Sequence, residues 1–229
     1  MKLEVAKDAE AAARLAAVFV AHCIRHAVAV RKQAHVAFSG GMTPRRMLEL
    51  LAKEDLPWES LHVFQVDERV VPRGDERRNL NLMQETLIAD GFLRPDHLHA
   101  MPVDAGDTEA AAREYQQTLE SFAGAPVALD LVQLGLGTDG HTASLFPGDP
   151  TVSIQDREVA AAGVHAGLQR LTLTLPAINR ARTRLWLVTS SDKAARLREL
   201  VAGEGDTPAC LVRRDESFVI ADRAAATPG

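Results

Sequence analysis

An aspartate and a histidine lie two residues apart in a glycine-rich segment near the middle of the chain. Within residues 134–147, Gly137 and Gly140 flank Asp139, and His141 follows directly. Glycine allows positive φ angles and a close approach of the backbone to a ligand. An imidazole with a carboxylate partner can act as a general base near neutral pH. We therefore expect a catalytic loop in which His141 is the base, Asp139 is its partner and Gly137 contacts the substrate.

A second segment has the composition of an anion-binding turn. Ser39, Gly40 and Gly41 follow a short apolar run, and Thr43 and Pro44 come next. The glycines permit a tight turn, the threonine is a good N-cap, and proline suits the first turn of a helix. The free N–H groups at such a helix start could bind a phosphate. A capped turn without a ligand explains the same residues, so both interpretations stay open here.

Charged residues stand at the ends of other predicted strands and helices. Asp67 and Arg69 follow an apolar strand directly, Arg170 precedes another, and Lys193 begins a predicted helix. Asp67 could orient a sugar hydroxyl or a water, and Arg69 could stabilise negative charge on a carbonyl oxygen. Arg170 and Lys193 are the two cations that phosphate sites commonly use. A solvated turn or an ordinary surface cation would explain each residue taken alone.

Other polar residues are assigned less specific roles. Residues 73–78 are dense in charge and predict a mobile, solvated loop, with Asn79 as the cap of the following helix. Seven histidines are expected to be core or surface residues: His22, His26, His35, His62, His97, His99 and His165.

The elements that must position these residues alternate along the first half of the chain. The 229 residues, of which 46% are hydrophobic and 25% charged, predict one soluble domain over 1–229. Apolar spacing predicts helices at 8–30, 44–52, 79–89, 108–122 and 192–201. Short apolar runs predict strands at 35–38, 62–66, 99–103, 129–134, 158–164, 171–175, 185–189, 209–212 and 218–221.

This order predicts an α/β fold of the Rossmann-like, doubly wound type. The sheet should be mostly parallel and flanked by helices, and the strand-rich second half suggests a mixed edge or a small β extension. In such sheets ligands bind beyond the carboxyl ends of the strands, near the point where the strand order reverses. The loops described above all follow predicted strands, so we expect them to converge on one cleft.

Composition excludes several classes of protein. A net charge of −5 argues against a surface for nucleic acid or an anionic membrane. Cys23 and Cys210 are far apart and lack metal-ligand spacing, so both are expected to be core thiols. We find no signal-peptide pattern and no apolar run of membrane-spanning length, which predicts a cytoplasmic protein. No loop gathers three metal ligands, so neither a metal nor another cofactor is expected.

Taken in order, these segments resemble the 6-phosphogluconolactonases of the bacterial, Rossmann-like type. The matching segments are 39–44, 67–72, 135–147 and 170–172, followed by Lys193. The resemblance implies hydrolysis of 6-phospho-D-glucono-1,5-lactone in the oxidative pentose phosphate pathway. It also implies that His141 activates water and that the 39–43 loop, Arg170 and Lys193 hold the phosphate. The expected partner is this small phosphorylated lactone, and the protein is expected to be a monomer or a weak dimer.

Two residues separate the chain from related patterns. The family usually carries a serine where this sequence has Arg78, which leaves a substrate contact by Asn79 open. Amino-sugar-phosphate isomerases and deaminases share the fold but carry a catalytic glutamate where this sequence has Phe146. A carboxylate helps to move protons between adjacent carbons, whereas lactone hydrolysis does not need it. A non-catalytic, sugar-phosphate-sensing domain is the other alternative.

Overall fold

A seven-stranded parallel sheet forms the centre of the computed structural model, which describes residues 1–227. The predicted domain also includes residues 228–229, which lie outside the described part. The strand order is β1-β10-β9-β6-β2-β3-β5, and all neighbouring pairs are parallel. The strands are β1 (Lys2–Ala6), β2 (Ala34–Phe38), β3 (Leu61–Gln65), β5 (Leu98–His99), β6 (Leu131–Leu134), β9 (Arg184–Val188) and β10 (Ser217–Asp222).

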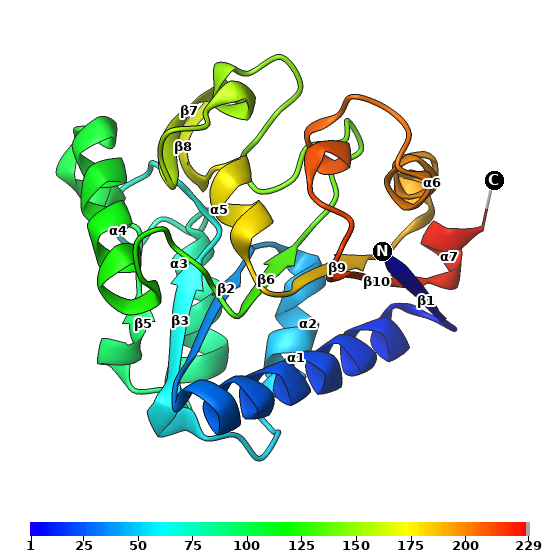
Figure 1. The fold of residues 1–229 in the computed structure, drawn as a ribbon, viewed down its shortest axis with the longest axis horizontal. Coiled ribbons are helices and arrows are strands. Elements are labelled where there is room, and N and C mark those ends of the chain that lie inside the picture. The colour runs from blue at the N-terminus through cyan, green and yellow to red at the C-terminus, as the bar shows by residue number, and fades with distance from the viewer. Residues whose placement is uncertain (228–229) are drawn as a thin grey trace.

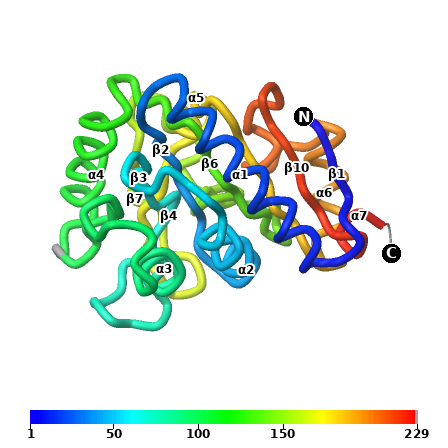
Figure 2. The backbone as a smooth tube through the Cα atoms, turned by 90° about the horizontal axis from the view of Figure 1, so that it is seen from below, coloured from blue at the N-terminus to red at the C-terminus, as the bar shows by residue number. Residues whose placement is uncertain are grey.

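Helices cover both faces of this sheet (Figure 1). They are α1 (Ala9–Arg31), α2 (Met42–Leu51), α3 (Asn79–Met83), α4 (Thr108–Ala123), α5 (Leu175–Arg180), α6 (Ala194–Ala202) and α7 (Arg223–Ala226). One apolar layer joins the sheet to α1, α2 and α3, and the other joins it to α4, α5 and α6. Figure 2 shows both chain ends beside β1 and β10, at one edge of the sheet.

The sequence explains why both faces are buried. In β9, Leu185 and Leu187 pack into the layer with α1, whereas Trp186 and Val188 pack into the opposite layer. Successive side chains of a strand point to opposite faces, so an uninterrupted apolar run fills both layers. The same alternation occurs in β2, where Ala37 faces away from Val36.

A second, three-stranded antiparallel sheet stands on one side of the main sheet (Figure 1). It consists of β4 (Asp67–Arg69), β8 (Leu168–Leu173) and β7 (Val159–His165), in the order β4-β8-β7. The α/β, mostly parallel, doubly wound fold is therefore confirmed, and the predicted β extension is this small sheet. The alternative of a mixed edge is wrong, because every ladder of the seven-stranded sheet is parallel.

Several local predictions need correction. The apolar run 209–212 is not a strand: its first three residues lie in the 3₁₀ turn Pro208–Leu211, which the proline begins, and Val212 follows the turn. The strand expected at 99–103 is only the two-residue β5. The helix expected at 79–89 is α3 followed by one π-helical turn, Gln84–Ile88. Strands β1 and β4 and helices α5 and α7 were not predicted.

Helix α1 contradicts the expectation that no apolar segment reaches membrane-spanning length. By length and composition alone, Ala9–Arg31 is long and apolar enough to cross a membrane. In the structure it packs along the sheet, and its alanine-rich face is fully buried, with Ala16, Val20 and Ile24 each 0% exposed. Its apolar character is accounted for by the core of the domain.

Candidate active site

Polar residues from separate loops meet where the strand order reverses. Strand β2 lies between β3 and β6, so the loops that leave β2 and β6 start side by side. Together with residues that follow β3 and β9 and with the small sheet, they enclose one cleft. Its walls comprise Ser39, Gly40, Asp67, Arg69, Asn79, Gly135, Leu136, Gly137, His141, Ala143, Arg170 and Lys193. Most residues predicted from separate loops therefore share one site.

His141 and Asp139 form a direct pair on the loop that follows β6. The distance from His141 Nδ1 to Asp139 Oδ1 is 2.6 Å, and the His141 backbone N–H donates to the same oxygen at 3.1 Å. A proton on Nδ1 satisfies this contact and leaves Nε2 as the acceptor. Partial burial acts to raise the pKa of Asp139, but the hydrogen bonds from His141 outweigh it and lower that pKa. The carboxylate thus remains ionised beside the imidazole.

Asp67 lies on the floor of the cleft with its carboxylate buried. Its Oδ2 accepts a hydrogen bond from Ser144 Oγ at 2.7 Å, and Asn79 Nδ2 lies 3.3 Å from Oδ1. Burial raises the pKa of Asp67 above its usual range, although the Ser144 hydrogen bond opposes that shift. Sequence reasoning did not find Ser144, because its contact with Asp67 spans 77 residues and arises only from the fold.

Two arginines face each other across the antiparallel ladder of the small sheet. Arg69 in β4 is the register partner of Arg170 in β8, and both line the cleft. Arg69 Nη1 donates to Asn79 Oδ1 at 2.7 Å. Burial lowers the pKa of Arg170, and its buried Nε has no hydrogen-bond partner among the described residues. Like charges placed directly opposite each other destabilise a ladder, and the Asp67 and Glu68 carboxylates oppose the effect of Arg69 on the pKa of Arg170.

Only part of the first glycine loop lines the cleft. Ser39 is anchored to the next strand, because its Oγ donates to the Gln133 carbonyl at 3.0 Å. The expectation that Thr43 caps the helix is wrong: α2 begins at Met42, and Gly41, with φ of 110°, is the N-cap. Thr43 Oγ1 instead lies 3.4 Å from Thr189 Oγ1. Gly41 and Thr43 are not among the cleft-lining residues, whereas Ser39 and Gly40 are.

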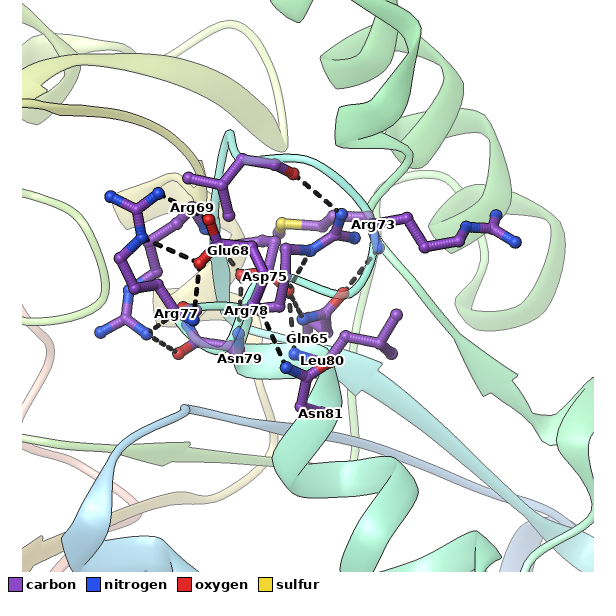
Figure 3. A network of polar contacts seen from close by, with 12 residues as sticks. Gln65, Glu68, Arg69, Arg73, Asp75, Arg77, Arg78, Asn79, Leu80 and Asn81 are labelled. Atoms are coloured by element: carbon purple, nitrogen blue, oxygen red, sulfur yellow. Dashed lines mark hydrogen bonds and ion pairs between the residues drawn. The ribbon is translucent and has the colours of Figure 1, made fainter.

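A buried glutamate organises the segment that follows β4 (Figure 3). Glu68 is 0% exposed, and its oxygens accept hydrogen bonds from four N–H groups: Gln65 Nε2, Arg69 N, Asn79 N and Leu80 N. Asn79 is the first residue of α3, so its predicted role as a helix cap is wrong. Its side chain lies in the cleft, where Nδ2 donates to the Asp67 carbonyl at 2.9 Å.

The sequence predicted that Arg78 belongs to a solvated loop, but its side chain is buried. Its side chain is 3% exposed, and it forms ion pairs with Glu68 at 3.3 Å and with Asp104 at 2.8 Å. Only the outer part of the segment is exposed, where Arg77 pairs with Asp75 at 2.6 Å. Arg78 thus links the buried Glu68 to the partly exposed Asp104.

The remaining candidates lie away from the cleft. Cys23 is half-buried against the α1 layer, where burial raises its pKa to about 11. Cys210 is also only half-buried, so the expectation of two core thiols is wrong for it. His22 and His26 are exposed on α1, which agrees with the prediction that each is a core or a surface residue. Among the described residues, no group of three His, Cys, Asp or Glu side chains is placed to hold a metal ion.

The comparisons with known proteins agree with this geometry. The family model described as "Glucosamine-6-phosphate isomerases/6-phosphogluconolactonase" matches residues 7–220. A 6-phosphogluconolactonase of Synechocystis sp. is 41% identical over 195 residues, which are 83% of this chain and 81% of the relative. One from Streptomyces coelicolor is 36% identical and covers 99% of this chain and 94% of its own length. The solved 6-phosphogluconolactonase of Thermotoga maritima superposes with a TM-score of 0.85 at 26% identity, over 96% of this chain and 98% of that one.

Proposed function

The chain belongs to the family of glucosamine-6-phosphate isomerases and 6-phosphogluconolactonases, and from this premise we propose that it hydrolyses 6-phospho-D-glucono-1,5-lactone to 6-phosphogluconate. The observation that carries the proposal is the His141–Asp139 pair, which shares one cleft with three cations, Arg69, Arg170 and Lys193. A base and an anion site are the two things that hydrolysis of a phosphorylated lactone requires. We place the protein in the cytoplasm, in the oxidative pentose phosphate pathway, as a monomer or weak dimer.

The proposed reaction uses His141 first as a base and then as an acid. Nε2 removes a proton from a water while the water oxygen attacks the lactone carbonyl carbon, C1. The C1–ring oxygen bond of the tetrahedral intermediate then breaks, and the imidazolium returns the proton to the departing ring oxygen. Water is consumed and no other reactant is needed. Asp139 keeps the His141 proton on Nδ1 and stabilises the imidazolium between the two steps.

The charge that develops on the carbonyl oxygen needs a donor. Arg69 is the candidate from within the cleft, because Asn79 and the Arg77 carbonyl, each 2.7 Å from its Nη1, fix its guanidinium. A fixed donor stabilises the oxyanion without reorganising during the reaction. The buried Asp67 would orient a substrate hydroxyl or the attacking water.

The phosphate is assigned to the cationic part of the cleft. Arg170, Lys193 and the Ser39–Gly40 turn would hold it, and binding energy gained there would orient the distant lactone carbon. Arg supplies a planar fork and Lys a compact charge, which suits a tetrahedral dianion.

The site lacks a carboxylate that the isomerase or deaminase alternative would need. Phe146 is 8% exposed and stands next to His141, with a ring-centroid distance of 4.5 Å, where those enzymes are expected to carry a glutamate. Without that carboxylate, proton transfer between adjacent carbons has one acid–base group fewer.

The decisive experiment is a coupled assay with lactone generated freshly in the cuvette and read against its spontaneous hydrolysis. We expect the wild-type protein to accelerate formation of 6-phosphogluconate and to leave glucosamine 6-phosphate unchanged. A rate equal to the spontaneous rate would exclude lactonase activity. Binding of the lactone without turnover would instead support a sensing domain.

A further inference from the structure

Phe146 is held between three cleft or near-cleft side chains although it does not line the cleft itself. Its ring stacks on His165, with centroids 3.7 Å apart and planes inclined by 16°. The His141 ring lies 4.5 Å away, tilted by 35°. The Arg170 guanidinium carbon stands 5.4 Å from the Phe146 centroid, within the range of a cation–π contact. One ring therefore contacts both the proposed base and a proposed phosphate ligand.

His165 is itself held by a carboxylate outside the cleft. It is the last residue of β7, and its Nε2 lies 2.9 Å from Asp149 Oδ2. Asp149 is fixed in turn, because the Thr151 N–H and hydroxyl donate to Oδ1 and the Gly163 N–H donates to Oδ2. The stack thus connects a rigid turn outside the cleft to the side chains inside it.

Arg170 also packs against the Phe146 ring. Its neighbour across β7 is Ala162, whose side chain supplies little support, and its other register partner is the like-charged Arg69. The face of Phe146 is the apolar surface that the structure offers to the guanidinium. A Phe146 ring free to turn would leave both Arg170 and His141 with more accessible rotamers, and each must then be ordered when substrate binds.

We propose that His165 is a positioning residue: its stack on Phe146 holds that ring in the orientation that aligns His141 and Arg170 for the reaction. The inference rests on the proposed lactonase activity for its kinetic consequence, but the stack and its effect on His141 exist independently of turnover. The sequence placed His165 among ordinary core or surface histidines. Its importance comes from the β7–β8 pairing, which no local pattern indicated.

The kinetic test compares three substitutions of His165 with a control substitution of the neighbouring Val164. His165→Phe keeps a flat ring that can stack on Phe146, whereas His165→Ala and His165→Leu remove it, the leucine keeping most of the volume. We expect kcat to fall about tenfold in the Ala and Leu variants and to stay within about twofold of wild type in the Phe variant. Val164→Ala, at the adjacent position of the same strand and 68% exposed, is the matched control and should match wild type.

An NMR measurement separates this proposal from the proposed function. The His141 Cε1–H resonance should carry a ring-current shift from Phe146, which we expect His165→Ala and His165→Leu to change and His165→Phe to preserve. If wild type does not hydrolyse the lactone, the proposed function fails while this spectrum still tests the stack. If wild type is active but the Leu and Ala variants keep both its kcat and its His141 resonance, the positioning role alone is overturned. A Phe variant as impaired as the Leu variant would also overturn it, because stacking would then not be what matters.

Discussion

Gly137 lies so close to His141 that no side chain fits between them: a Cβ built on Gly137 would stand 2.1 Å from His141 Nδ1 and 2.6 Å from Asp139 Oδ1. The short Asp139–His141 hydrogen bond therefore depends on a missing side chain two residues before the aspartate. Glycine is required here for close approach and not for an unusual φ angle.

Gly137→Ala should break the pair without unfolding the protein. We expect kcat to fall by about 10²-fold or more, because the imidazole must move away from the position in which we propose that it activates water. Thr138→Ala is the control, because Thr138 is the next residue of the same loop, is exposed and does not line the cleft. Steady-state kinetics and thermal melting of both variants make the comparison. Equal kcat values for the two alanine variants would show that the pair is not needed.

His141→Ala should reduce kcat by about 10²–10⁴-fold, which is the usual contribution of general acid–base catalysis. Asp139→Asn should have a smaller effect, because the base remains but its tautomer is no longer fixed by a carboxylate. His26→Ala removes an exposed imidazole on α1 and serves as the control. Retention of full activity by His141→Ala, with an unchanged circular dichroism spectrum, would exclude this residue as the base.

Lys193→Met should discriminate between substrates that differ only in the phosphate. Loss of one charge-assisted hydrogen bond costs about 1.5–3 kcal/mol, so we expect KM for the phosphorylated lactone to rise about 10- to 100-fold. The kcat/KM for unphosphorylated gluconolactone should stay unchanged. Lys7→Met, at an exposed position on the surface, is the control. An equal loss with both lactones would show that Lys193 does not contact the phosphate.

A cluster of stacked histidines should make the fold sensitive to acid. His62 Nδ1 lies 3.0 Å from His99 Nε2, and the His62 ring stacks on His97 at 4.3 Å. Burial, together with the neighbouring His97 and His35, lowers the pKa of His62 and of His99 to about 4, whereas Asp96 acts in the opposite direction.

The sign of this effect follows from the unfolded reference pKa of about 6.5. The two histidines are neutral in the folded protein, so their contribution is complete above pH 6.5 and is lost as the pH falls toward 4. We expect the urea midpoint to drop less between pH 7 and pH 4.5 in a His62→Phe, His99→Phe double variant than in wild type. His26→Gln should keep the wild-type pH dependence. Identical slopes in the double variant and wild type would contradict the prediction.

Arg78→Met should destabilise the protein more than it affects the chemistry. Removing one partner of a buried ion pair costs about 3–5 kcal/mol, and the hydrogen bonds that Glu68 keeps favour the lower end of that range. Adding Glu68→Gln to this variant should restore part of the loss, because the uncompensated charge is removed. Urea unfolding of the two single variants and the double variant measures the coupling. Additive effects would show that the two side chains do not interact.

The parts of the fold that could be predicted are those in which local pattern and final burial agree. Strands β2 and β3 are mostly apolar and β9 contains the apolar run Leu185–Val188, and such runs suit a sheet that is buried on both faces. Strand β4 was missed because its residues Asp67–Arg69 are all charged and become a strand only by pairing with β8. The run 209–212 was mistaken for a strand because periodicity cannot distinguish four apolar residues in a turn from four in a sheet.

The candidate site was predictable to the extent that its residues follow strands. Ser39, Asp67 and His141 are close together because parallel strands end at one edge of the sheet. Thr43 was misplaced by a difference of two residues in the start of α2. Ser144 and His165 contact Asp67 and Phe146, to which no sequence spacing relates them, so they could be recognised only from the three-dimensional contacts.

The opposition of Arg69 and Arg170 across the small sheet gives the ligand an influence on folding stability. Under the proposed function, a phosphate held by Arg170 offsets the repulsion between the two guanidinium groups, so we expect the free energy of unfolding to rise with the concentration of the sugar phosphate.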